Sequence, residues 1–81
     1  MLVERRHSPR RRTLKGGRIV FDDHRSVLDC TVHNVSESGA QLRLPNVVGV
    51  PDTFELHFDG IVRSAWVVWK QTDRLGITWI T

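Results

Sequence analysis

FELHFDG at residues 54–60 is the clearest local signal of secondary structure in the chain. Its apolar residues alternate with polar ones, which is typical of a strand that buries one face. The dipeptide Asp59-Gly60 closes the stretch, and it tolerates the positive φ angles that a tight hairpin turn requires. The next run, 61–70, is rich in branched and aromatic residues and is long enough to bend around a barrel. The stretch therefore predicts an antiparallel β-hairpin.

Alternating patterns continue on both sides of this hairpin. They predict strands at 16–21, 26–35, 40–44 and 75–79, with polar turns between them. No segment shows a convincing helical periodicity. Six short antiparallel strands can bury their apolar faces only by closing on themselves. We therefore predict an all-β fold, namely a small six-stranded antiparallel β-barrel.

The inward positions of these strands make up the predicted core. They are Val20, Leu28, Cys30, Val32, Ala40, Leu42, Phe54, Leu56, Phe58, Val68 and Ile77, joined by some of the tryptophans. The alternation leaves open which of Trp66, Trp69 and Trp79 point inward. Tryptophans on strands more often pack than stack on a ligand, and Trp69, next to Lys70, is the one to watch as a stacking surface.

The chain is short, and its basic residues are concentrated at one end. A domain of 81 residues has a small core, which favours a binding module over an enzyme. Residues 1–18 contain seven of the 12 Lys and Arg residues and one acidic residue, so they carry +6, whereas residues 19–81 carry −3. We expect a flexible basic arm over residues 1–13 and a single barrel domain over residues 14–81. Such an arm suits a partner that bears phosphate groups.

The sequence also predicts the compartment. No apolar run approaches the roughly 18 residues of a membrane span, and no export signal is evident, so membrane insertion is not expected. The single cysteine, Cys30, has no disulfide partner and lies in an apolar run, where a thiol behaves as a small hydrophobe. These features predict a cytoplasmic protein.

Two polar segments are unusual for a plain barrel, and the first is RRHSPR at residues 5–10. Its Arg6 and Arg10 lie about 13 Å apart in an extended chain, close enough to hold different parts of one dinucleotide. A guanidinium can pair with a guanine edge or with phosphate oxygens, and its flat face can stack on a purine.

The second polar segment is NVSESG at residues 34–39, between two predicted strands. Asn34 and Ser36 can hydrogen-bond a base edge or cap the turn. Gly39 permits a positive φ or the close approach of a ligand. Both a structural and a binding role are physically sensible here.

Together the two segments resemble the signature of the PilZ family, an Arg-Arg-x-x-x-Arg arm followed by an Asp/Asn-x-Ser-x-x-Gly turn. The matching residues are Arg5, Arg6, Arg10, Asn34, Ser36 and Gly39. The closing pattern Leu75-Gly76-Ile77 is also similar to that family, so the resemblance covers nearly the whole chain from Glu4 onward.

The resemblance implies a barrel that binds the bacterial second messenger cyclic di-GMP and needs no cofactor. Arg6 and Arg10 would grip guanine and phosphate groups, and the residues of the turn would form the opposing platform. We expect the arm to become ordered around the ligand and the signal to pass to a downstream protein partner. Family members typically carry a helix after the last strand, which this sequence lacks; the exposed apolar surface leaves a homo-oligomer and a protein partner both open.

Other functions remain to be weighed against this one. Small barrels with basic arms and exposed aromatics also bind single-stranded RNA or DNA, with steep salt dependence. A protein-interaction adaptor that binds no nucleotide is a third alternative. The sequence shows no catalytic triad, phosphate-cradling loop or buried carboxylate pair, so we expect no enzyme. Its histidines lack the paired spacing of zinc ligands, so no metal site is expected.

Overall fold

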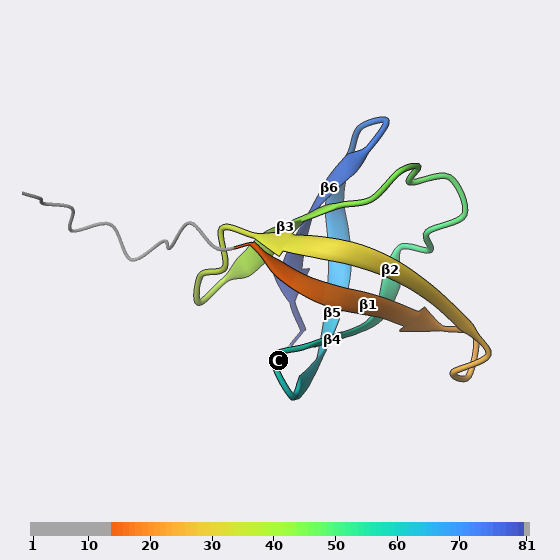
Figure 1. Cartoon of the computed structure of the whole chain (residues 1–81), viewed down its shortest axis with the longest axis horizontal. Coiled ribbons are helices and arrows are strands. Elements are labelled where there is room, and N and C mark those ends of the chain that lie inside the picture. Colours follow the sequence, from red (N-terminus) through yellow and green to blue (C-terminus); the bar gives the residue numbers. More distant parts are fainter. Residues whose placement is uncertain (1–13, 81) are drawn as a thin grey trace, which may run out of the picture.

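The computed structural model describes residues 14–80, and these form six β-strands. The strands are β1 (Lys15–Phe21), β2 (Ser26–His33), β3 (Gly39–Arg43), β4 (Thr53–Phe58), β5 (Ile61–Lys70) and β6 (Arg74–Trp79) (Figure 1). The predicted basic arm, residues 1–13, lies outside the described residues. No helix within the described part of the chain could span a membrane.

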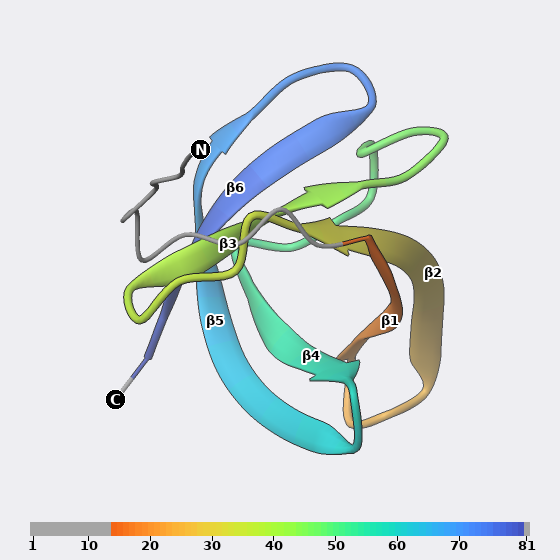
Figure 2. The same ribbon diagram turned by 60° about the vertical axis from the view of Figure 1, so that its left-hand side comes forward.

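The strands close into a barrel in the order β1-β2-β3-β6-β5-β4, and all neighbouring strands are antiparallel. β1 closes the ring by pairing with β4, with Ile19 opposite Leu56. Figure 2 shows the strands arranged around a central space, which the core side chains fill. The all-β, six-stranded barrel expected from the sequence is confirmed.

The turns follow from residues that accept a left-handed backbone. Asp59 and Gly60 have φ angles of 55° and 76° and connect β4 to β5, as the sequence predicts. Asp22, Asp23 and His24 all have positive φ in the turn between β1 and β2. Asn34 has a φ of 51°, and β2 therefore ends at His33, two residues earlier than predicted.

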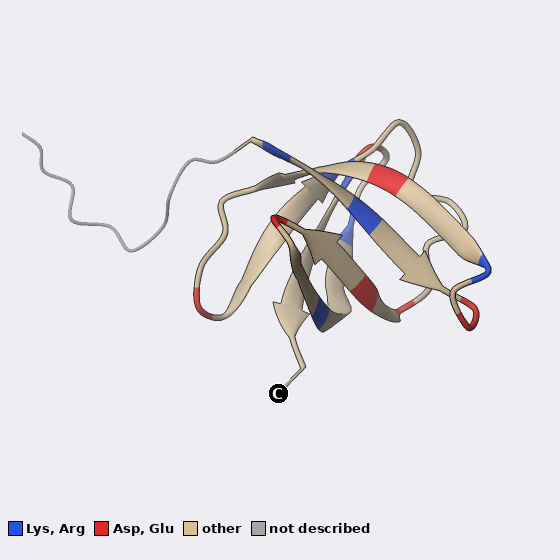
Figure 3. Cartoon of the chain, turned by 60° about the horizontal axis from the view of Figure 1, so that its bottom comes forward, with Lys and Arg blue, Asp and Glu red and all other residues tan. Residues whose placement is uncertain are grey.

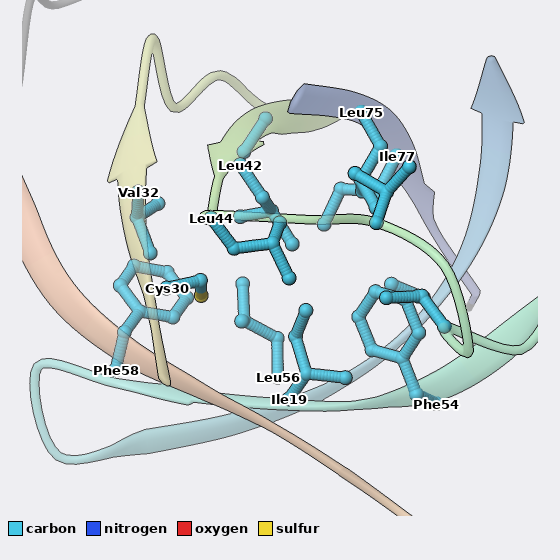
Figure 4. Packing of buried hydrophobic residues seen from close by; sticks show 14 of the residues in the cluster. Ile19, Cys30, Val32, Leu42, Leu44, Phe54, Leu56, Phe58, Leu75 and Ile77 are labelled. Carbon is cyan, nitrogen blue, oxygen red and sulfur yellow. The ribbon is translucent and has the colours of Figure 1, made fainter. Parts of the chain in front are cut away.

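The core is close to the predicted one. Figure 4 shows side chains from facing strands meeting inside the barrel. Buried residues absent from the predicted set are Ile19, Leu44, Val47, Val50, Ala65 and Leu75. Of the three tryptophans whose direction the sequence leaves open, Trp79 is the buried one. Leu28 is half-buried and packs against the cluster. Burial raises the pKa of the Cys30 thiol to about 11, so this group stays protonated and apolar as expected.

The prediction that Val68 belongs to the core is wrong, because Val68 is 58% exposed. A β-bulge between Val67 and Trp69 shifts the register of β5 against β6. Val67 pairs with Ile77 and Trp69 pairs with the next residue, Gly76, so Val68 is the extra residue of the bulge. The bulge therefore turns Trp69 onto the outer face of the barrel.

Candidate functional site

The turn at residues 34–39 is built around the hydroxyl of Ser36. This oxygen accepts hydrogen bonds from the backbone N–H groups of Ser38 and Gly39, with N···O distances of 3.3 and 3.4 Å. The backbone N–H of Ser36 donates to the carbonyl of Gly39 at 2.8 Å. Ser36 thus has the capping role that the sequence allows, and its side chain fixes the shape of the turn.

The close packing of β3 against β6 leaves no room for a side chain at Gly39. A Cβ at this position would overlap the carbonyl oxygen of Ile77 and lie 2.9 Å from the carbonyl carbon. Gly39 pairs with Thr78, and it is buried. The close approach that the sequence suggests is therefore an approach of one strand backbone to another.

The end of β6 holds the turn in place from the other side. Trp79 donates its backbone N–H to the carbonyl of Ser38 and its indole Nε1–H to the carbonyl of Ser36, both at 3.0 Å. Its ring stacks on Phe58 with centroids 6.1 Å apart, and the guanidinium of Arg63 lies 4.3 Å from the ring centroid. The turn is thus anchored in the core by a residue that local sequence reasoning does not connect to it.

One row of residues crosses the outer face of the barrel beside this turn. The strand pairing aligns His33 of β2, Gln41 of β3, Gly76 of β6 and Trp69 of β5. A Cβ on Gly76 would overlap the indole Nε1 of Trp69, so the ring lies directly against the glycine. Trp69 is 37% exposed.

Gln41, Trp69 and Gly76 of this row line a shallow pocket of about 170 Å³. We call Asn34, Ser36, Gln41, Trp69 and Gly76 the turn platform, and all five line this pocket. Asn34 donates from Nδ2 to Oε1 of Gln41 at 3.3 Å, which orients both amide groups. A flat surface of glycine and indole, bordered by amides, can stack a base and hydrogen-bond its edge.

The platform lies near the point where the chain enters the barrel. Lys15, the first residue of β1, pairs with Val32 of β2, which is two residues before the platform residue Asn34. The sequence-predicted site residues Arg5, Arg6 and Arg10 lie outside the described residues. The structure brings Asn34, Ser36 and Gly39 to the same pocket, and Gly39 also packs closely against the backbone of β6.

A larger hollow, with a volume of about 590 Å³, lies elsewhere among the described residues. It lies between β1 and the β4–β5 hairpin and is lined by side chains of both charge signs, including Asp29, Arg18 and Asp59. Figure 3 shows basic and acidic residues interspersed over the barrel. No three His, Cys, Asp or Glu side chains within residues 14–80 are grouped so that they could hold a metal ion.

Comparisons with known proteins agree with this architecture. The family model described as PilZ domain matches residues 4–81. A crystal structure described as the PilZ domain of CeSA from a cellulose synthesizing bacterium superposes with a TM-score of 0.68 over 91% of this chain and 82% of that chain, at 14% sequence identity. No curated protein matches the chain significantly. Since the family model spans almost the entire sequence and the barrel has the same fold as this PilZ structure, the chain belongs to the PilZ domain family.

Proposed function

We propose that this PilZ domain is a non-catalytic sensor that binds cyclic di-GMP between its arginine arm and the turn platform. PilZ domains as a family are cyclic di-GMP-binding modules. The observation that carries the proposal is the position of the platform: Asn34 and Ser36 line a pocket close to the start of β1. The turn of the signature therefore lies near the strand that directly follows the arm in the sequence.

The geometry assigns a task to each part. Trp69 and Gly76 offer a flat surface for one face of a guanine, and the amides of Asn34 and Gln41 are placed for its edge. Because the pocket is shallow, the opposite face of the base and the phosphates need a second covering group. Arg10 is five residues from Lys15, so the chain allows it a reach of about 17 Å from the barrel.

Binding in this way converts ligand concentration into a change of shape. The arm becomes ordered around the dinucleotide, and the new surface of arm and ligand is what a downstream protein partner recognises. Ordering a segment consumes part of the binding free energy, so an affinity of the order of a micromolar, about −8 kcal/mol, is expected.

Calorimetric titration of cyclic di-GMP at near-physiological salt tests this proposal, with GMP and a short single-stranded RNA as controls. We expect saturable micromolar binding that is selective for the cyclic dinucleotide, because only this ligand offers two guanines and two phosphates within one compact molecule. Salt-sensitive binding of RNA without binding of cyclic di-GMP would instead identify a nucleic-acid barrel. No heat with any of the three would leave a nucleotide-independent adaptor.

The stacking role of Trp69 gives a separate prediction. Trp69→Ala is expected to weaken cyclic di-GMP binding about tenfold, since loss of a base–aromatic stack costs about 1–3 kcal/mol. Trp66→Ala is a matched control, because Trp66 is on the same strand and is 50% exposed but does not line the platform pocket. Its affinity should change less than about twofold. Equal effects of the two substitutions in the calorimeter would argue against a base on the platform.

A further inference from the structure

A second pocket, of about 200 Å³, adjoins the turn platform. We call it the basic pocket; its lining residues are His33, Asn34, Gln41, Leu42, Arg43 and Arg74. Asn34 and Gln41 also line the platform pocket, so the two hollows share a wall. A ligand on the platform therefore has the basic pocket directly beside it.

The two arginines of this pocket are placed against each other. Arg43 of β3 and Arg74 of β6 are directly opposite in the strand pairing. Like charges in this position destabilise a sheet. The ion pairs within the described residues offset this only in part, through a 3.5 Å contact from Nε of Arg74 to Oδ1 of Asp73. An anion between the two guanidinium groups would remove the repulsion.

His33 provides an independent indication of a missing partner. Its Nε2 atom is buried, and within the described residues it has no hydrogen-bond partner. Burial, followed by the nearby charges of Arg43 and Arg74, lowers the pKa of this imidazole. The uncharged ring has one N–H donor and one nitrogen acceptor, and a buried ring nitrogen without a partner costs free energy in either role. His33 lines the basic pocket, and in the tautomer with the proton on Nε2 a small rotation of the imidazole would let an oxyanion there accept the hydrogen bond from this nitrogen.

We propose that Arg43, Arg74 and His33 form a phosphate subsite that continues the turn platform and is separate from the arginine arm. This inference rests on the proposed function, because it places a phosphodiester of the dinucleotide beside the base held by Trp69 and Gly76. Gly76 and Arg74 are two residues apart on β6, about 7 Å, which suits the span from a nucleotide base to its phosphate. Paired guanidinium groups bind phosphate oxygens through charge-assisted hydrogen bonds.

The test uses the full chain and the double variant Arg43→Gln/Arg74→Gln. Arg25→Gln is the matched control, because it removes the same kind of charge from the turn at the far end of β2 from His33. Cyclic di-GMP is titrated calorimetrically, and inorganic phosphate is titrated at constant pH and ionic strength while the imidazole resonances of His33 are followed by NMR. The two ligands distinguish a phosphodiester of the dinucleotide from free phosphate.

We expect the double variant to bind cyclic di-GMP about tenfold or more weakly, and the control to change less than about twofold. Inorganic phosphate should shift the His33 resonances in the unmodified chain and not in the double variant. The double variant should melt no lower than the unmodified chain, because its substitutions remove opposed like charges.

The outcomes separate the subsite from the function on which it rests. A phosphate response of His33 that is absent, or that is equal in the double variant, overturns the subsite. Loss of the phosphate response with unchanged cyclic di-GMP affinity overturns its assignment to the dinucleotide. If cyclic di-GMP does not bind the unmodified chain, the proposed function fails, while an arginine-dependent response to phosphate still supports the subsite.

Discussion

Gly39→Ala is expected to lower the free energy of unfolding by about 3 kcal/mol, a large share of the roughly 5–10 kcal/mol available to a domain of this size. The added Cβ would overlap the backbone carbonyl of Ile77, which is held in the pairing of β3 with β6. A backbone group in a sheet cannot rotate away as a side chain can. The two strands must therefore separate locally, and the turn that Trp79 anchors must shift with them.

Gly16→Ala provides the control for this substitution. Gly16 is also on a strand, but a Cβ there would meet no atom within 4 Å. Its φ does not lie in the left-handed region, so alanine should be neutral or stabilise by up to about 1 kcal/mol by restricting the unfolded chain. Urea unfolding of both variants makes the comparison. Equal midpoints would mean that β3 and β6 do not approach as closely as described.

Arg6→Ala/Arg10→Ala is expected to weaken cyclic di-GMP binding more than about 100-fold. Each guanidinium contributes charge-assisted hydrogen bonds that are worth about 1.5–3 kcal/mol, and the two losses together amount to about 3–6 kcal/mol. Calorimetric titration measures the change. The single variants should each lose about tenfold or more, because in the proposed complex the two side chains hold different groups of the ligand.

Arg18→Ala controls for the loss of positive charge, since Arg18 lines the large hollow between β1 and the β4–β5 hairpin and not the platform pocket. Its affinity for cyclic di-GMP should remain within about 0.5 kcal/mol of the unmodified chain, the usual range for surface changes away from a site. Hydrogen exchange adds a second readout: amides of residues 2–8 and 10–13 should gain protection when ligand is added. An unchanged affinity in the Arg6/Arg10 double variant would show that the arm does not hold the ligand.

The strands, the turns and the family could be predicted because each leaves a local pattern. Alternation along FELHFDG and its neighbours reflects the opposite directions of successive side chains in a strand. Asp59-Gly60 marks a turn because few other residue pairs accept its φ angles. The arm and turn motifs of the PilZ signature are likewise short runs of residues, and the family match over residues 4–81 confirms the resemblance.

The rest of the candidate site depends on which residues of different strands become neighbours. Gln41 is far in sequence from Trp69 and Gly76, and only the pairing of β3, β6 and β5 aligns the three residues beside Asn34. The bulge that exposes Val68 is invisible in the alternation of β5, since it is a mismatch between two strands.

Contacts between distant parts of the chain also give single residues roles that the sequence does not reveal. In the sequence Arg63 looks like an ordinary surface arginine. In the fold its guanidinium lies over the ring of Trp79, and the indole N–H of Trp79 donates to the carbonyl of Ser36 in the turn at residues 34–39. Arg43 and Arg74 become a pair only through the register of β3 and β6. Local backbone preferences and side-chain periodicity thus specify the elements from the sequence, whereas the register between distant strands, set by packing of the closed barrel, decides which side chains share a site.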